Sequence, residues 1–268
     1  MNLAIRDALV RVQGSALVHD VRVDPQAGTV AWQGRSRAAS TFAWQPPVTG
    51  AVYGTLLNDR AALAALAEAA GRPPYKAPPK APVLYVKPRN TRSAYGWPIV
   101  VPAGVPALAM GACVGVVIGR TACRVRADDA LDFVAGYTVA NDVSVPHDSF
   151  YRPMVRYRCR DGFCPIGPWV IARRHVADPD ALAIRVEIDG AVRQRATTGT
   201  FVRTVARLLA DVTEFMTLAP GDVLLTGVPA DAPLAQAGQR VAITIDGVGT
   251  LVNTLVAAEG PASVEGEP

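Results

Sequence analysis

Lysine, paired cysteines and long apolar runs are scarce or missing in this chain of 268 residues. Only three of its 27 basic residues are lysines, Lys76, Lys80 and Lys87, and the 27 basic and 23 acidic residues are spread along the chain. Because no basic cluster offers a footprint for a phosphate backbone, nucleic acid is not an expected partner. No segment reaches the roughly 18 apolar residues that a membrane span needs. We therefore expect no membrane association and predict a cytoplasmic protein.

The four cysteines do not follow the spacing of a metal site. Cys113, Cys123, Cys159 and Cys164 include no pair separated by two residues, so the sequence indicates neither a zinc site nor a disulfide framework. We expect them to be reduced packing residues. Apolar residues make up 50% of the chain and charged residues only 19%. This balance favours surface that is buried between subunits, so a dimer is expected.

The hydrophobic pattern predicts a mixed α/β chain in which strands outnumber helices. Residues 1–50 alternate apolar and polar positions in short runs, which is typical of a small antiparallel β segment. Asp189-Gly190 and Asp246-Gly247 each stand between two alternating runs and predict hairpins. Hairpin signals outnumber strand–helix–strand units, so we expect a β-rich roll with a few peripheral helices. Residues 51–258 form its main domain, and residues 259–268 are expected to be a flexible tail.

Three segments carry helix signals. An Ala-rich helix is predicted over residues 60–71, with Asn58 or Asp59 as its cap. A short helix is predicted over residues 128–135, ended by the glycine that follows. Apolar residues at spacings of three and four predict the longest amphipathic helix over residues 200–216.

Polar side chains gather in the stretch 135–169, between predicted strands. An apolar run leads into Asp142, a loop then brings Tyr151 and Arg152, and a dense polar run follows around Arg158. Packing between strands does not require carboxylate, phenol and guanidinium groups at these positions, so we take this stretch as the candidate site.

Four phrases of the sequence together resemble the fumarylacetoacetate hydrolase family. They are VVIGR at 116–120, GYTVANDVS at 136–144, DGFCPIGPWV at 161–170 and EFMTLAPGDVLLTGVP at 214–229. The phrases PPYKAPPK and VKPRNT add a resemblance to one branch of the family. That branch holds the N-terminal half or subunit of bifunctional isomerase/decarboxylases of 4-hydroxyphenylacetate (homoprotocatechuate) breakdown.

The resemblance implies a fumarylacetoacetate hydrolase-like β-roll whose open end holds Mg²⁺ or Mn²⁺ against an oxo-acid. For this branch it implies two small dicarboxylate substrates. They are 5-carboxymethyl-2-oxo-hex-3-ene-1,7-dioate, which is decarboxylated, and 2-hydroxyhepta-2,4-diene-1,7-dioate, which is isomerised.

The sequence departs from the family at the metal ligands. The family's Glu-x-Glu pair falls at Gly111 and Cys113, and its Asp falls at Asp142. Glycine offers no side chain and a thiol is too soft for a hard ion, so we predict that this chain alone binds Mg²⁺ weakly or not at all. The His and Glu of the family's helical lid fall at Ala62 and Ala65, and neither alanine can move a proton.

Seven residues remain as candidates for catalysis or binding. The Lys of the family's K-x-x-D motif is replaced by Arg158, whose guanidinium cannot readily act as a base. The catalytic candidates are Asp142, Arg158 and Asp161, and the substrate-binding candidates are Tyr151, Arg152, Gln194 and Thr226.

Several of these residues, and His147 in addition, also have a structural interpretation. Asp142 is either the retained metal ligand or the partner of a neighbouring cation such as Arg158. Tyr151 and Arg152 are substrate contacts or loop anchors, Asp161 is catalytic or part of a turn, and Thr226 contacts substrate or shapes a turn. His147 beside Asp148 is either an oriented acid/base or a surface-loop residue.

Two hypotheses of function follow. In the first, the chain is an enzyme subunit that decarboxylates or isomerises oxo-dicarboxylates, with Asp142 as its residual metal or proton ligand. In the second, it is a non-catalytic partner that keeps the fold and supports a metal-bearing paralogue in a hetero-oligomer.

Overall fold

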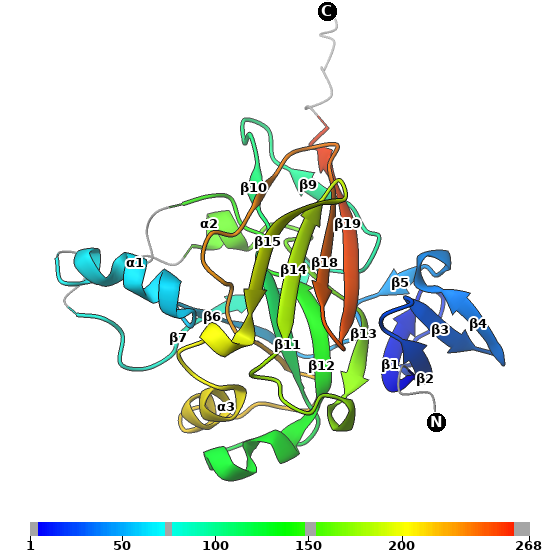
Figure 1. Cartoon of the computed structure of the whole chain (residues 1–268), viewed down its shortest axis with the longest axis horizontal. Helices are drawn as coiled ribbons and strands as arrows, with labels where there is room; N and C mark the ends of the chain where they lie inside the picture. Colours follow the sequence, from blue (N-terminus) through cyan, green and yellow to red (C-terminus); the bar gives the residue numbers. More distant parts are fainter. Residues whose placement is uncertain (1–4, 73–76, 148–153, 260–268) are drawn as a thin grey trace, which may run out of the picture.

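A large β-sheet runs through the whole molecule in the computed structural model, which describes residues 5–72, 77–147 and 154–259 (Figure 1). Within the described residues this sheet has 12 strands, ten of them in one continuous order. That order is β4 (Arg35–Ala38), β3 (Thr29–Trp32), β2 (His19–Asp24), β1 (Arg6–Val12), β13 (Cys164–Ala172), β12 (Val134–Asn141), β11 (Ala112–Ile118), β16 (Val223–Leu225), β6 (Val52–Leu56) and β7 (Val83–Lys87). The short strands β5 (Trp44–Gln45) and β8 (Arg92–Ser93) pair with β1 and β13.

The N-terminal strands continue this sheet. Strand β1 pairs antiparallel with β13, with Ala8 opposite Ile171 and Val10 opposite Trp169. The described part of the predicted β segment, residues 5–50, therefore packs on the main body of the same chain.

A second, five-stranded sheet covers strands β11 to β13 (Figure 1). Its order is β15 (Ala191–Thr197), β14 (Ala183–Ile188), β18 (Arg240–Ile245), β19 (Gly249–Ala257) and β9 (Ile99–Val101). A two-stranded pair, β10 (Leu108–Ala109) and β17 (Leu234–Ala235), lies apart from both. The hairpins predicted at Asp189-Gly190 and Asp246-Gly247 are confirmed as the turns β14–β15 and β18–β19.

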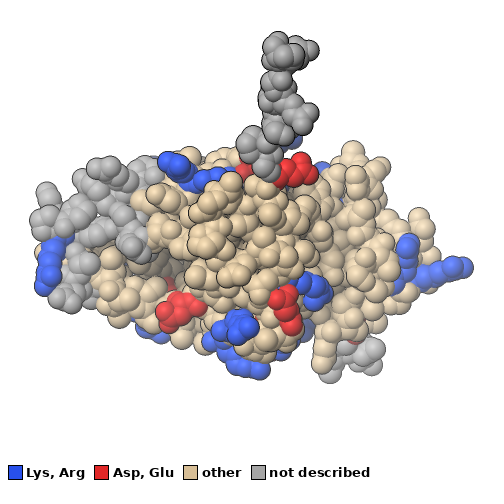
Figure 2. Space-filling view, turned by 90° about the horizontal axis from the view of Figure 1, so that it is seen from above, with Lys and Arg blue, Asp and Glu red and all other residues tan. Residues whose placement is uncertain are grey.

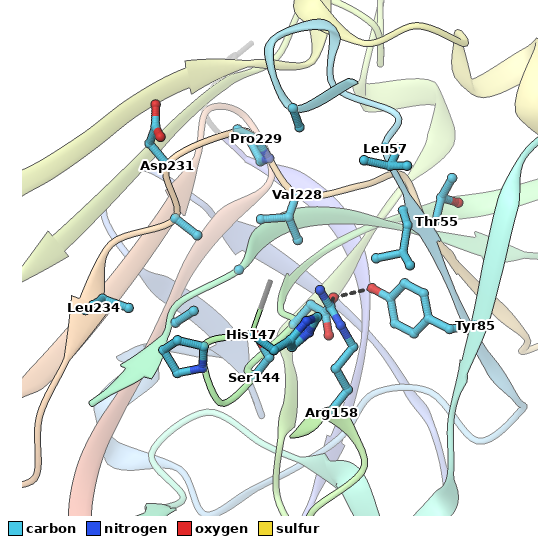
Figure 3. A pocket seen from close by; sticks show the side chains of 17 residues that line it. Thr55, Leu57, Tyr85, Ser144, His147, Arg158, Val228, Pro229, Asp231 and Leu234 are labelled. Atoms are coloured by element: carbon cyan, nitrogen blue, oxygen red, sulfur yellow. Dashed lines mark hydrogen bonds and ion pairs between the residues drawn. The ribbon is translucent and has the colours of Figure 1, made fainter. Parts of the chain in front are cut away.

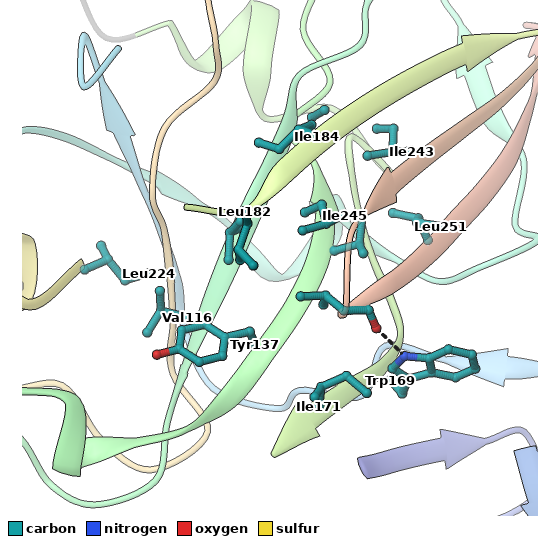
Figure 4. Close-up of a cluster of buried hydrophobic side chains, with 14 of the residues drawn as sticks. Val116, Tyr137, Trp169, Ile171, Leu182, Ile184, Leu224, Ile243, Ile245 and Leu251 are labelled. Atoms are coloured by element: carbon teal, nitrogen blue, oxygen red, sulfur yellow. Dashed lines mark hydrogen bonds between the residues drawn. The ribbon is translucent and has the colours of Figure 1, made fainter. Parts of the chain in front are cut away.

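The main core fills the space between the two sheets (Figure 4). Val114 and Val116 of β11 face it, and the buried Trp169 donates from Nε1 to the carbonyl of Val248 at 2.7 Å. The opposite face of β11 contributes Cys113 and Val117 to a second apolar cluster. Because β11 is buried on both faces, its sequence is apolar almost throughout, as expected of a central strand. The result is the mixed, β-rich roll that the hydrophobic pattern predicts.

Three α-helices are described, α1 (Arg60–Ala70), α2 (Val155–Arg158) and α3 (Val205–Thr213). The predicted cap of α1 is confirmed at Asp59, whose Oδ1 accepts from the amides of Ala61 and Ala62. The prediction of a helix over 200–216 was too long. Thr204 caps α3 by accepting from the amide of Arg207, so regular helix begins only at residue 205.

The helix predicted over 128–135 was wrong in type and extent. The segment is a 3₁₀ helix over Ala127–Phe133, and strand β12 begins at Val134, which pairs with Ile118. Pairing with β11 therefore ends the helix before Gly136. The other 3₁₀ turns described are Ala39–Thr41, Arg89–Thr91, Arg173–His175 and Thr198–Thr200.

Charged side chains lie in separate small groups on the face shown in Figure 2, where most described residues are uncharged. No helix in the described residues is long and apolar enough to cross a membrane.

Candidate functional site

A pocket of about 500 Å³ opens where β6 and β12 end, beside Tyr85 of β7 (Figure 3). Its wall combines apolar side chains from three separate segments with a small polar group around Asp142 and Arg158. The lining residues are Thr55, Leu56, Leu57, Ala62, Tyr85, Ala109, Gly111, Asp142, Ser144, Pro146, His147, Arg158, Val228, Pro229, Asp231, Ala232 and Leu234.

Asp142 lies at the base of this pocket and its side chain is fully buried. Its Oδ2 accepts from Arg158 Nη1 at 2.7 Å and also from the hydroxyl of Tyr85. Its Oδ1 lies 2.6 Å from Lys87 Nζ. Burial alone would raise the pKa of Asp142, but the charges of Lys87 and Arg158 outweigh it and hold that pKa below its ordinary value. The carboxylate is therefore ionised and balanced by two cations.

Lys87 is buried as completely as its partner. Besides the contact with Asp142, its Nζ donates to the backbone oxygens of Arg158 at 2.7 Å, Phe163 at 2.9 Å and Val143 at 3.0 Å. An ammonium group with four oxygens around it has an acceptor for every proton, which offsets the cost of burying its charge.

Tyr85 joins this cluster because it stands two residues before Lys87 on β7, on the same face of the strand. Its ring lies on the backbone of Gly54, where a Cβ atom would come within 2.0 Å of Tyr85 Cζ. The guanidinium of Arg158 lies over the Tyr85 ring, with its Cζ 5.1 Å from the ring centroid. Burial and the negative charge of Asp142 raise the pKa of Tyr85 well above its ordinary value, so the phenol is a neutral donor.

The residues at the family's metal positions do not fit a divalent ion. A Cβ atom at Gly111 would lie 2.4 Å from the backbone oxygen of Asp142, so the backbone leaves no room for a side chain there. Cys113 faces the second apolar cluster, and burial raises the pKa of its thiol well above the ordinary value. Among the described residues, no three His, Cys, Asp or Glu side chains are grouped as metal ligands. The one carboxylate of the former set, Asp142, is already held by Lys87 and Arg158.

The structure brings together some of the predicted site residues and separates others. Arg158 and Asp142 form the ion pair that the sequence suggested as one alternative. Asp161 is exposed, accepts from Asn90 Nδ2 at 2.7 Å and lies outside this pocket. Tyr151 and Arg152 fall outside the described residues.

Gln194 and Thr226 lie behind the pocket wall. Gln194 Nε2 donates to the backbone oxygens of Ala230 and Asp231, so it supports the segment that lines one side of the pocket. Thr226 is buried, and its hydroxyl lies 3.3 Å from the backbone oxygen of Val114. Neither side chain lines the pocket in the structure.

His147 lines the same pocket as Arg158, and its ring lies against that of Tyr157 with 5.5 Å between centroids. In Figure 3 it stands beside Ser144 and Arg158. Ala62, at the family's lid histidine, also lines the pocket and contributes only a methyl group.

Buried polar atoms of two pocket-lining residues have neither a hydrogen bond nor an ion pair within the described residues. They are Arg158 Nε and Thr55 Oγ1, and both are buried. A buried donor without an acceptor is costly, so these atoms mark where a polar ligand would be stabilised.

Sequence reasoning missed Lys87 and Tyr85. A signal was present, because only three lysines occur in the chain and one of them ends a strand with a tyrosine two residues before it. The hydrogen-bond acceptors of Lys87, however, are backbone carbonyls, which every residue has and which a sequence pattern therefore cannot indicate.

The chain is similar to proteins of known family over most of its length. The family model described as fumarylacetoacetate (FAA) hydrolase C-terminal matches residues 51–256. A 4-hydroxyphenylacetate degradation bifunctional isomerase/decarboxylase of Salmonella dublin is 42% identical over 210 residues, covering 78% of this chain and 48% of that protein. The chain thus spans about half the length of the curated relatives it matches.

Solved structures show the same fold. The 5-carboxymethyl-2-hydroxymuconate delta-isomerase of Mycobacterium smegmatis superposes with a TM-score of 0.76 at 30% identity, covering 94% of this chain and 100% of that one. A fumarylpyruvate hydrolase of Pseudomonas aeruginosa, solved with Mn²⁺ and pyruvate, has a TM-score of 0.69 at 21% identity and covers 94% and 97%. At that identity the likeness concerns the fold alone.

Proposed function

Because this chain belongs to the fumarylacetoacetate hydrolase family, we propose that it binds an oxo-dicarboxylate as a subunit of an isomerase/decarboxylase of 4-hydroxyphenylacetate breakdown. The relatives at 42–44% identity carry that activity in their names. The observation that carries the proposal is the charge of the pocket. In the buried cluster, Lys87 and Arg158 bear two positive charges against the single negative charge of Asp142, which leaves one net positive charge there, while the other lining carboxylate, Asp231, is exposed to solvent.

Arg158 is the group that would hold the substrate. One of its nitrogens is taken by Asp142, while its Nε has no partner among the described residues. A guanidinium with a spare donor suits a carboxylate or a 2-oxo oxygen. The neutral hydroxyl of Tyr85 stays on Asp142, so its role is to fix the acceptor that orients Arg158. The apolar wall around Leu57, Val228 and Leu234 would face the carbon chain of the substrate.

For isomerisation of the dienol, a proton leaves the 2-hydroxyl group and another joins a carbon of the chain. Asp142 is a poor base for this step because two cations lower its pKa. Histidine is the side-chain type whose charge changes near neutral pH, and His147 lines the pocket. We therefore assign the proton transfer to His147 and the binding of the carboxylate to Arg158.

The experiment compares two glutamine variants from the same helix. Arg158→Gln removes the guanidinium in the pocket, and Arg156→Gln removes an exposed one. With 2-oxoheptanedioate as the probe in calorimetry, Arg158→Gln is expected to weaken binding at least tenfold, because a charge-assisted contact contributes about 1.5–3 kcal/mol. Arg156→Gln is expected to bind like the wild type. Equal affinities for both variants would overturn the proposal.

A second function, that of a non-catalytic partner, is favoured by one observation. The metal positions Gly111 and Cys113 offer no hard ligand, and Gly111 has no room for one. Turnover of 2-hydroxyhepta-2,4-diene-1,7-dioate by the purified chain distinguishes the two functions. Turnover that His147→Gln abolishes supports the enzyme. Probe binding without turnover, with turnover appearing only when a paralogous subunit is added, supports the partner.

A further inference from the structure

Four oxygen atoms surround the ammonium group of Lys87. They are Asp142 Oδ1 at 2.6 Å, Arg158 O at 2.7 Å, Phe163 O at 2.9 Å and Val143 O at 3.0 Å. The Lys87 side chain has no exposure to solvent. This is an oxygen cage around a single buried positive charge.

The cage is assembled from segments that are distant in sequence. Val143 follows β12, Arg158 ends α2 and Phe163 precedes β13. Each of these carbonyls points its partial negative charge at the same place, and without a cation there they would repel one another and the carboxylate of Asp142. The cation at the centre therefore joins three chain segments as well as balancing a charge.

The dimensions of the cage suit an ammonium group and not a small divalent ion. Mg²⁺ requires oxygen ligands at about 2.0–2.1 Å in an octahedral array. The four distances here run from 2.6 to 3.0 Å, and only one of the four oxygens belongs to a charged group, the carboxylate of Asp142. A divalent ion at Asp142 would also have to approach Lys87 and Arg158, which repel it.

We propose that Lys87 is a tethered cation, which joins Asp142 and the surrounding backbone in the way that a dissociable metal ion joins its ligands. Its bond to the backbone oxygen of Arg158 also makes it a positioning residue, because it fixes the helix from which the guanidinium reaches the pocket. The site then keeps its shape and its positive charge at any concentration of free metal. This inference does not depend on the reaction that the chain carries out.

The first test uses the unmodified full chain. After treatment with EDTA, its thermal unfolding midpoint is measured with and without millimolar MgCl₂ or MnCl₂, and both salts are titrated by calorimetry. The expected result is an unchanged midpoint. Saturable binding of Mg²⁺ or Mn²⁺ that Asp142→Asn abolishes would overturn the proposal.

The second test removes the tether and returns its charge in solution. Lys87→Ala deletes three methylene groups and the ammonium, which together correspond to propylammonium. The matched control is Lys80→Ala, since Lys80 is exposed. Lys87→Ala is expected to unfold about 10 °C below that control. Propylammonium chloride at tenfold excess over its Kd is expected to raise the midpoint of Lys87→Ala by about 3 °C and to leave Lys80→Ala unchanged.

Tetramethylammonium chloride serves as the salt control because it carries the charge without any N–H donor. Equal rescue by both salts, or equal midpoints for Lys87→Ala and Lys80→Ala, would contradict a caged ammonium. If Lys87→Ala does not fold, Lys87→Met keeps most of the chain volume and loses only the charge and the donors. A midpoint of Lys87→Met equal to that of Lys80→Ala would overturn the proposal in the same way.

Discussion

The substitution Asp142→Asn is expected to be among the most destabilising changes of a single atom in this protein. It keeps the shape of the side chain but removes the negative charge that lies 2.6 Å from Lys87 and 2.7 Å from Arg158. Lys87 is fully buried and Arg158 is 12% exposed, so water can restore little of the lost interaction. Removing one partner of a buried ion pair costs about 3–5 kcal/mol, and the same range is expected here.

The free energy of unfolding is measured by urea titration, with reversibility checked by refolding. The control is Asp128→Asn, because the Asp128 carboxylate is 85% exposed and its contact with Arg126 is 3.7 Å long. That control is expected to match the wild type, since exposed pairs contribute little. A loss below about 1 kcal/mol for Asp142→Asn would refute the idea that this carboxylate is the charge on which the cluster depends.

A double-mutant cycle separates the pair from its surroundings. Asp142→Asn and Lys87→Met are made singly and together, and the double variant is expected to be less destabilised than the sum of the two by about 1–3 kcal/mol. The reason is that each single variant keeps one charge of the Asp142–Lys87 pair and removes the other, whereas the double variant removes both; Arg158, the second partner of Asp142, is present in all four proteins of the cycle. Additive effects would show that the two groups act independently in spite of the 2.6 Å contact.

Three further predictions concern pH and packing. The folded pKa of Asp142 lies below its unfolded value, so the unfolded chain takes up the proton first as pH falls below about 4. The stabilising effect of the ionised carboxylate is full above that pH and is lost below it. The urea midpoint should therefore fall less steeply with decreasing pH in Asp142→Asn than in the wild type, and equal slopes would count against the lowered pKa. Gly111→Ala is expected to lower the free energy of unfolding by about 1–3 kcal/mol, because its Cβ would lie 2.4 Å from the Asp142 carbonyl oxygen. The control Gly199→Ala, whose Cβ would have its nearest contact at 3.4 Å, is expected to lower it less. Equal urea midpoints for the two variants would contradict the clash at Gly111. Burial raises the pKa of Tyr137 to about 12, and its hydroxyl has no partner among the described residues. Tyr137→Phe should therefore match or exceed the wild-type free energy of unfolding at neutral pH. It should also lose less of that free energy than the wild type between about pH 10 and 12, where only the unfolded tyrosine ionises. A decrease above about 1 kcal/mol at neutral pH would show that the Tyr137 hydroxyl has a hydrogen-bond partner.

Local signals predicted much of the fold. The Asp-Gly pairs at 189 and 246 stand at two observed hairpins, and Asp59 caps α1, because turn and cap chemistry depends on neighbouring residues. The limits of two helices were wrong. Pairing of Val134 with Ile118 ends the first of them, and the bridge of Phe201 to Asp59 together with the local cap Thr204 delays the start of α3. Periodicity within one segment cannot report the contacts with distant segments.

The candidate site was predictable only in part. Asp142 and Arg158 are 16 residues apart within one polar stretch, so their pairing was a reasonable inference from proximity. Lys87 is 56 residues from Val143 and 76 from Phe163, and it binds backbone atoms that every residue possesses. The lack of room for a side chain at Gly111 likewise could not be predicted, because it depends on how close the backbone oxygen of Asp142 comes in the folded chain.

The pairing of β1 with β13 has a consequence for how this protein can be divided. The family match begins at residue 51, yet the hydrogen-bonded ladder continues across that boundary into residues 6–12. A truncation to residues 51–258 would strip one side of β13 and leave a bare row of amides and carbonyls, which is a template for self-association. The region matched by the family model is therefore smaller than the sheet, which begins at β1.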